Sequence, residues 1–343
     1  MSATRANAGR ALAIAALLLA LAVVAAAFAA RSWWERALSA PEGRAQPALV
    51  EVPAGASVRA VAAELEARGA IRDARAFAWL ARLEKKDGAL KVGEYEIAPG
   101  LAARDVLEQL VSGRVRLLAV TIPEGLRIEE IAARVAAAGF GSEAEYVALA
   151  RDPALAKEHG AGETLEGFLF PETYRFPRGA SAREVVAAQL AEFERAWSPL
   201  APLAAKRGLS QRDAVILASL IEKETGAPEE RPLISAVFHT RMARGMRLET
   251  DPSVIYGIAN FDGNLKRIHL EDESNPYNTY RIPSLPPGPI ANPGAAALRA
   301  AVEPADADFL FFVARGDGTH EFTTNYRDHL NAVRRFQLRR RSR

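Results

Sequence analysis

Two glutamates and a threonine near the middle of the chain have the residue types and spacing that acid–base chemistry needs. Residues 210–226 read SQRDAVILASLIEKETG, and Glu222, Glu224 and Thr225 stand at the end of this stretch. Glu224 occupies the next position of an apolar stripe with helical spacing, where a core residue is expected. Glu222 lies about 200° away around a helix axis and is expected to point elsewhere. Desolvation raises a carboxyl pKa, which makes Glu224 a candidate general acid near neutral pH.

The helix that must position Glu224 has recognisable ends. Ser210 followed by Asp213 predicts its start by capping, and Gly226 and Pro228 predict its end. The stripe that Glu224 extends consists of Ala214, Leu217, Ala218 and Ile221. A second interpretation stays open, in which Glu224 merely pairs with an arginine or caps a neighbouring loop.

Two further segments could line a sugar-binding site. The loop 275–280 (NPYNTY) has amides and tyrosines without an apolar period, and such side chains suit hydroxyl groups, N-acetyl groups and sugar faces. The segment 166–174 (EGFLFPETY) combines aromatic residues with two carboxylates, although a core-facing turn explains it equally well. Asp251, directly before Pro252, is sufficiently explained as a helix N-cap.

The composition excludes several classes of function. The chain has 343 residues, is 49% hydrophobic and carries a formal net charge of +2, so its charge balance predicts no nucleic-acid partner. It contains no cysteine, which excludes disulfides and thiolate chemistry. The five histidines show no ligand spacing, and phosphate-loop, nucleophile-elbow and zinc-protease motifs are absent. We therefore expect no metal and no cofactor.

The N-terminal region predicts a membrane anchor. Ala11 to Ala30 is an unbroken run of small and apolar residues, long enough to cross about 30 Å of hydrocarbon, and Trp33 and Trp34 follow it. We expect a single-pass helix in the inner membrane, with its N-terminus in the cytoplasm and the rest of the chain on the periplasmic side. A cleaved signal peptide is the alternative, since residues 27–30 (AFAA) resemble a cleavage site.

A repeat precedes the segment with Glu224. Residues 50–69 read VEVPAGASVRAVAAELEARG, and residues 120–139 read VTIPEGLRIEEIAARVAAAG. Each copy predicts a strand, a Pro-x-Gly turn and an amphipathic helix that ends at glycine. The expected buried faces are Val58, Val61, Ala62 and Leu65 in the first copy, and Ile128, Ile131, Ala132 and Val135 in the second. These copies resemble LysM-like modules of bacterial wall proteins, and we expect them to bind or position substrate without taking part in the chemistry.

Four motifs together resemble one enzyme family. They are ASLIEKETG, RMARGMRLETDPSVIYG, NPYNTY and LPPGPIANPG. Their order and spacing are similar to those of the YceG-like, MltG-type endolytic peptidoglycan transglycosylases. The resemblance places the catalytic glutamate of the family on Glu224, with Thr225 as its supporting hydroxyl residue. The other candidate substrate-binding residues are Glu222, Glu172, Tyr256, Asn278 and Tyr280.

The resemblance implies a lyase reaction with a single carboxyl group. Glu224 protonates the glycosidic oxygen and then takes the proton of the C6 hydroxyl of N-acetylmuramic acid, which leaves a 1,6-anhydro end within nascent glycan strands and so terminates their elongation. Expected partners are glycan strands and the inner membrane, and peptidoglycan synthases are left open. Two alternatives remain: a muramidase-type hydrolase with Glu222 or Glu172 as second acid, and a non-catalytic peptidoglycan-binding scaffold.

These observations predict an α+β chain. Its expected parts are a cytoplasmic N-terminus 1–10, a transmembrane helix 11–30, a linker 31–48, a LysM-like module 49–115, a second strand–turn–helix module and connection 116–165, a catalytic transglycosylase domain 166–337 and a basic tail 338–343.

Overall fold

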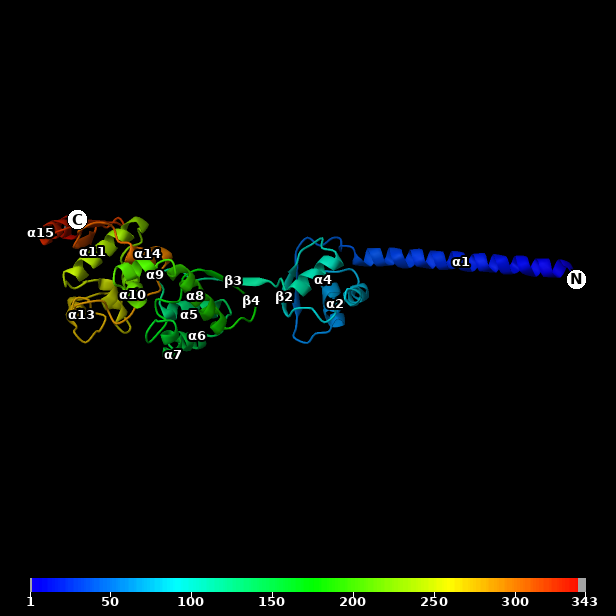
Figure 1. The fold of residues 1–343 in the computed structure, drawn as a ribbon, viewed down its shortest axis with the longest axis horizontal. Coiled ribbons are helices and arrows are strands. Elements are labelled where there is room, and N and C mark those ends of the chain that lie inside the picture. Colours follow the sequence, from blue (N-terminus) through cyan, green and yellow to red (C-terminus); the bar gives the residue numbers. More distant parts are fainter. Residues whose placement is uncertain (1, 339–343) are drawn as a thin grey trace. The chain divides into compact units, whose positions relative to one another are not determined.

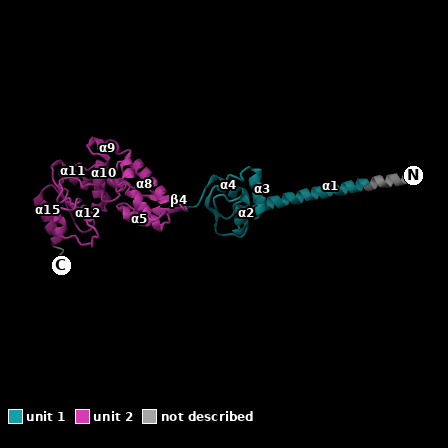
Figure 2. Cartoon of the chain, turned by 90° about the horizontal axis from the view of Figure 1, so that it is seen from below, with its two compact units in different colours: residues 1–117 teal, residues 118–343 magenta. Residues whose placement is uncertain are grey.

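The computed structural model describes the backbone of residues 2–338 and the side chains of residues 12–338. Residue 1 and most of the predicted basic tail, residues 339–343, lie outside the described residues. The chain divides into two compact units, residues 1–117 and 118–343 (Figure 2). Helices and short strands occur in both units, so the chain is mixed α and β, as predicted (Figure 1).

The first unit contains a long N-terminal helix and a small strand–helix–helix–strand arrangement. Strand β1 pairs with β2 in antiparallel fashion, with Val50 opposite Tyr95. The side chains of Ser57 and Asp73 cap the two intervening helices by accepting backbone N–H bonds. The elements are α1 (Ser2–Leu38), β1 (Ala48–Val52), α2 (Val58–Ala67), α3 (Ala74–Leu83), β2 (Gly93–Ile97) and α4 (Ala103–Ser112).

Helix α1 is both a candidate membrane span and part of the first unit. Among the described residues, Leu12–Leu38 is the one helical segment that is long and apolar enough to cross a membrane, with a mean hydropathy of 2.8. The end of α1 contacts α3, and Trp34 and Leu38 pack against the core of the unit. The apolar segment therefore continues, without a break in the helix, into contacts with the folded module.

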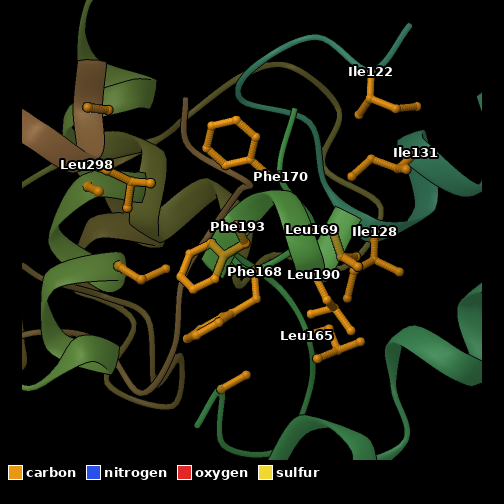
Figure 3. Packing of buried hydrophobic residues seen from close by; sticks show 14 of the residues in the cluster. Ile122, Ile128, Ile131, Leu165, Phe168, Leu169, Phe170, Leu190, Phe193 and Leu298 are labelled. Carbon is orange, nitrogen blue, oxygen red and sulfur yellow. The ribbon is translucent and has the colours of Figure 1, made fainter. Parts of the chain in front are cut away.

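The second unit begins with the second copy of the repeat. Its strand β3 lies beside β4, and its helix α5 buries Ile128, Ile131, Ala132 and Val135, as predicted. This copy shares one hydrophobic core with the region around α10, and Figure 3 shows Ile128 next to Leu169 and Phe168 next to Phe193 within that core. The elements are β3 (Leu117–Thr121), α5 (Ile128–Ala137), α6 (Glu143–Ala150), α7 (Pro153–Glu158), β4 (Thr173–Pro177), α8 (Ala182–Trp197) and α9 (Ala201–Lys206).

The rest of the second unit surrounds α10, which ends at Glu224. The second unit ends in a two-stranded antiparallel hairpin and a short helix. The elements are α10 (Gln211–Glu224), η1 (Pro228–Glu230), α11 (Arg231–Ala243), α12 (Asp251–Tyr256), α13 (Arg267–Glu271), α14 (Ala295–Val302), β5 (Phe311–Ala314), β6 (His320–Thr323), α15 (Tyr326–Val333) and η2 (Arg334–Leu338).

Helix α10 is buried on every side over two turns. All residues from Ala214 to Ile221 are buried, whereas the sequence pattern predicts a single apolar stripe. The difference arises because α9, α11, α12 and α14 contact this helix from several directions. The polar Ser219 is accommodated because its hydroxyl donates to the Ile216 carbonyl and accepts from the Ile290 N–H. A helix enclosed in this way holds its last residue, Glu224, in a fixed position.

Candidate active site

Glu224 is the last residue of α10, and its surroundings favour the protonated carboxyl group. The start of the helix is fixed by Ser210, whose hydroxyl accepts the Asp213 N–H, as predicted. Desolvation, together with the nearby charge of Asp251, raises the pKa of Glu224 to about 7. The negative end of the helix dipole acts in the same direction. Glu224 can therefore give up a proton at neutral pH and take one back.

One wall of the site faces Glu224 and consists of Thr250, Asp251 and Tyr280. The Thr250 side chain lies beside the Glu224 carboxyl group and lowers its pKa, against the effect of desolvation. Thr250 is 1% exposed, and its Oγ1 has no hydrogen-bond partner of full geometry among the described residues. The Tyr280 hydroxyl donates to Asp251 Oδ1 over 2.7 Å, and the Glu224 charge is close enough to raise the pKa of Tyr280.

Buried hydrogen bonds hold this wall in place. The hydroxyl of Thr279, a fully buried residue, accepts from the Thr250 N–H over 2.9 Å and also pairs with the Ser253 hydroxyl. Glu249, the residue before Thr250, has a left-handed φ of 53°. This conformation costs energy for a non-glycine residue. The Glu249 carboxylate accepts from Arg241 Nη1 over 2.9 Å, which compensates for that cost.

Thr225, the residue after Glu224, belongs to a buried clasp rather than to an open surface. Its hydroxyl donates to Glu230 Oε2 over 3.3 Å and accepts from the Ala227 N–H. Glu230 also accepts from the backbone N–H of His320 and contacts His320 Nδ1, both over 2.7 Å. We call Thr225, Glu230 and His320 the clasp. It joins the end of α10 to strand β6, which lies almost a hundred residues later in the sequence.

Glu222 makes its contacts with residues other than those that face Glu224, and its side chain is buried. Its side chain is 6% exposed, and Arg231 donates to it over 3.1 Å. Its other oxygen accepts from the Gly294 N–H over 3.0 Å. Glu124 lies at the edge of this cluster, where desolvation and the Glu222 charge raise its pKa. Both oxygens of Glu222 are therefore engaged within the protein.

The remaining candidates lie in different surroundings. Glu172 is exposed and accepts the N–H of its neighbour Thr173. Tyr256 donates to Glu166 Oε2 over 3.3 Å, and the Arg127 guanidinium lies 4.8 Å from its ring centre. Asn278 is fully buried, and its amide nitrogen donates to the carbonyls of His269, Leu270 and Asp272.

These positions separate the predicted residues into two groups. Only Tyr280 of the predicted substrate-binding residues lies among the residues that face Glu224. Asn278 is better described as an internal support of the loop that carries Tyr280, because its Oδ1 accepts the Tyr280 N–H. We therefore correct its role from substrate contact to loop support.

No pattern in the sequence marks Thr250, Asp251 or Glu230 as a site residue. Asp251 before Pro252 predicts a helix N-cap, but the structure makes Thr250 the N-cap and places Asp251 at the first helical position. Asp251 could still have been recognised, because it is a carboxylate next to Pro252, at the start of a helix that lies in a polar segment. Glu230 could not be recognised, because its partner His320 is distant in sequence.

Comparisons with known proteins point to one family. The profile of the YceG-like family matches residues 50–335. An endolytic murein transglycosylase of Bacillus subtilis (strain 168) is 30% identical over 304 residues, which cover 84% of this chain and 84% of that protein. A protein of the same name from Streptococcus pneumoniae serotype 2 (strain D39) is 28% identical and covers 82% of this chain, which spans 56% of that protein.

A solved structure has a similar fold. The crystal structure of a yceG-like protein from Listeria monocytogenes superposes with a TM-score of 0.59 at 28% sequence identity. The match covers 84% of this chain and 99% of that one. The likeness therefore extends over both compact units.

Proposed function

The chain belongs to the YceG-like family, and from this premise we propose that it is an endolytic murein transglycosylase with Glu224 as its single catalytic acid and base. The enzyme is a lyase that cleaves peptidoglycan. The observation that carries the assignment of Glu224 is its pKa of about 7 at the end of an enclosed helix, next to a polar wall.

The reaction needs one group that changes its protonation state twice. Protonated Glu224 gives its proton to the glycosidic oxygen as the bond from C1 of N-acetylmuramic acid breaks. The C6 hydroxyl of the same sugar then bonds to C1, and its proton returns to Glu224, so the enzyme is regenerated and no water is consumed. An internal hydroxyl benefits from proximity, which lowers the barrier relative to an external nucleophile.

The alternative of a hydrolase with a second acid at Glu222 or Glu172 finds little support. A hydrolase needs a second carboxylate that activates water or attacks the sugar. Both oxygens of Glu222 have protein partners, and Glu172 is on the surface beside Thr173. Neither of these two residues is placed to act as the second acid, so we retain the lyase reaction with Glu224.

The first unit has two proposed tasks. We propose that α1 anchors the enzyme in the inner membrane with the catalytic unit on the periplasmic side, which its apolar segment supports by length and composition. We also propose that the strand–helix–helix–strand arrangement is LysM-like and positions the glycan strand. Peptidoglycan synthases remain candidate partners, since strand termination would act on newly made glycan.

The proposed function is tested by the chemistry of the products. Uncross-linked glycan strands are digested with the full-length protein, and the muropeptides are analysed by mass spectrometry. We expect 1,6-anhydro ends, 18 Da lighter than the reducing ends that hydrolysis leaves, because no water is added. Predominantly reducing ends would support the hydrolase, and intact glycan that nonetheless binds the protein would support the scaffold.

A further inference from the structure

A second carboxylate, that of Asp251, faces the same space as Glu224. Helix α12 packs against α10, and Asp251 is the first residue of α12, with an exposed side chain. Among the described residues, its carboxylate has one side-chain partner, the Tyr280 hydroxyl at 2.7 Å. Asp251 is thus exposed and keeps free acceptor capacity, unlike Glu222.

The backbone around Asp251 is unusually constrained for a surface position. Left-handed Glu249 precedes it by two residues and is tied to buried Arg241. Thr279 holds the adjacent Thr250 N–H from the other side. Strain that is maintained by several buried contacts is typical of functional sites. An N-terminal helix position without a task would not need this support.

We propose that Asp251 is a second catalytic residue, whose carboxylate stabilises the positive charge that develops at C1 of the sugar while the glycosidic bond breaks. This inference rests on the proposed lyase function and deepens it. Asp251 forms no covalent bond and transfers no proton, so the balance of the reaction is unchanged. Tyr280 orients the Asp251 carboxylate through its hydroxyl group. The negative charge also favours protonated Glu224 before the reaction, since it raises the pKa of that group.

The proposal predicts a specific change in Asp251→Asn. The developing charge loses its counter-charge, so kcat falls about 10²-fold while KM stays within about twofold, the size seen when one preorganised electrostatic group is removed. Removal of a negative neighbour also lowers the pKa of Glu224, so the high-pH limb of the kcat profile moves to lower pH. Asp251→Glu restores part of kcat, because the charge returns.

The experiment compares purified full-length wild type, Asp251→Asn, Asp251→Glu, Tyr280→Phe and Asp317→Asn on isolated glycan strands between pH 5 and pH 9. Asp317 is exposed, and within residues 12–338 its carboxylate accepts hydrogen bonds from Thr319 of its own turn alone, so its variant is the matched control and keeps full activity. Tyr280→Phe leaves the charge in place and is expected to lose about tenfold in kcat, as one removed hydrogen bond to a charged group allows. Tyr280→Phe also tests the proposal if Asp251→Asn does not fold.

Three results would overturn the inference. They are an Asp251→Asn enzyme with more than half of the wild-type kcat, a loss of activity without movement of the high-pH limb, and a Tyr280→Phe enzyme indistinguishable from wild type. The proposed function is judged separately, because wild-type products with 1,6-anhydro ends establish the lyase reaction whatever Asp251 does.

A separate observation concerns a depression of about 700 Å³ between α2 and α3 in the first unit. Three exposed arginines line it: Arg59, Arg75 and Arg82. Trp79 and Asp87, which also line it, are exposed as well. Within residues 12–338, none of the three guanidinium groups has an ion pair or hydrogen bond, and Arg82 lies 5.8 Å from the Trp79 ring. Other arginines of this unit, such as Arg104 with Glu84, are paired.

We infer that this depression, the arginine pocket, binds the headgroup of an anionic phospholipid. Guanidinium groups match phosphate geometry, and tryptophan beside arginine is typical of membrane interfaces. The pocket lies partly on α3, which contacts α1, so it belongs to the same folded body as the apolar segment. This inference rests on the proposed membrane anchor and is independent of the catalytic residues.

The test uses the full-length protein in nanodiscs that mix phosphatidylglycerol with phosphatidylcholine, followed by native mass spectrometry of the retained lipids. The variant is R59Q/R75Q/R82Q, and R104Q is the control at a paired arginine. We expect wild type and control to retain more phosphatidylglycerol than the triple variant. Equal retention by all three proteins, or displacement of the lipid by soluble glycan fragments, would refute the lipid site. A triple variant that misfolds is replaced by Trp79→Ala, which must show the same loss.

Discussion

Replacement of Glu224 by glutamine separates activity from stability in a pH-dependent way. The pKa of Glu224 is about 7 instead of its usual 4.5, which corresponds to roughly 3 kcal/mol at about 1.4 kcal/mol per pH unit. At pH 7 about half of the enzyme therefore carries a protonated acid, whereas with an ordinary pKa only roughly one molecule in 300 would. Glutamine keeps the shape of the side chain but cannot transfer the proton, so we expect kcat to fall by about 10⁴-fold or more.

Glu224→Gln lowers activity, but it raises the free energy of unfolding relative to wild type as the pH increases. Because the folded protein binds the Glu224 proton more tightly than the unfolded chain does, this favourable contribution is complete below about pH 4.5 and is lost as the pH rises through 7. Glu224→Gln lacks this pH dependence. Relative to wild type, its free energy of unfolding should therefore rise by up to roughly 3 kcal/mol between pH 4.5 and pH 8.

The assay combines two measurements on the same preparations. Muropeptide release is followed at several pH values, and denaturant unfolding is measured at pH 4.5 and pH 8. Glu303→Gln serves as the control, because Glu303 is an exposed residue that pairs only with Arg299 in the next helical turn. Full activity of Glu224→Gln would refute the site assignment. A stability difference from wild type that is independent of pH would refute the elevated pKa.

Three further predictions concern other parts of the chain. Glu230→Gln weakens the clasp, so we expect a loss of about 2 kcal/mol in stability and a lower kcat with little change in KM, checked by unfolding and steady-state kinetics. Burial raises the pKa of Glu166 to about 8, so Glu166→Gln should match wild type near pH 4.5 and become more stable relative to it above pH 8, as urea titrations will show. A chain that begins at Arg116 should retain residual cleavage, because the second unit has its own core; a folded but inactive truncation, verified by circular dichroism, would contradict this.

The helix with Glu224 could be predicted from the sequence because its signals are local. Ser210 caps the helix, the apolar residues repeat along it, and Gly226 follows its end, so type and boundaries were correct. The same holds for the two strand–turn–helix copies, whose buried faces follow helical periodicity. In each case a short segment contains all the information that its conformation requires.

The surroundings of Glu224 could not be predicted in the same way. Thr250, Asp251 and Tyr280 meet Glu224 only after three segments of the chain have packed together, and no periodicity indicates such meetings. The burial of Glu222 likewise depends on Arg231 and on the Gly294 N–H. Glu224 stands out in the sequence because a charged residue interrupts an apolar pattern, whereas the residues around it lie in polar loops that have no such pattern to interrupt.

The clasp has a consequence for when the enzyme becomes active. His320 of β6 supports the end of α10 through Glu230, and the Leu310 carbonyl before β5 accepts from Arg241, which holds Glu249 and the wall with Asp251. Both sides of the site thus depend on a hairpin near the end of the chain. A chain whose synthesis has not yet reached this hairpin lacks the contacts of His320 and Leu310 with the rest of the unit. We therefore expect cleavage to begin only after translation has passed the hairpin, and we expect a protease that removes the hairpin to abolish it.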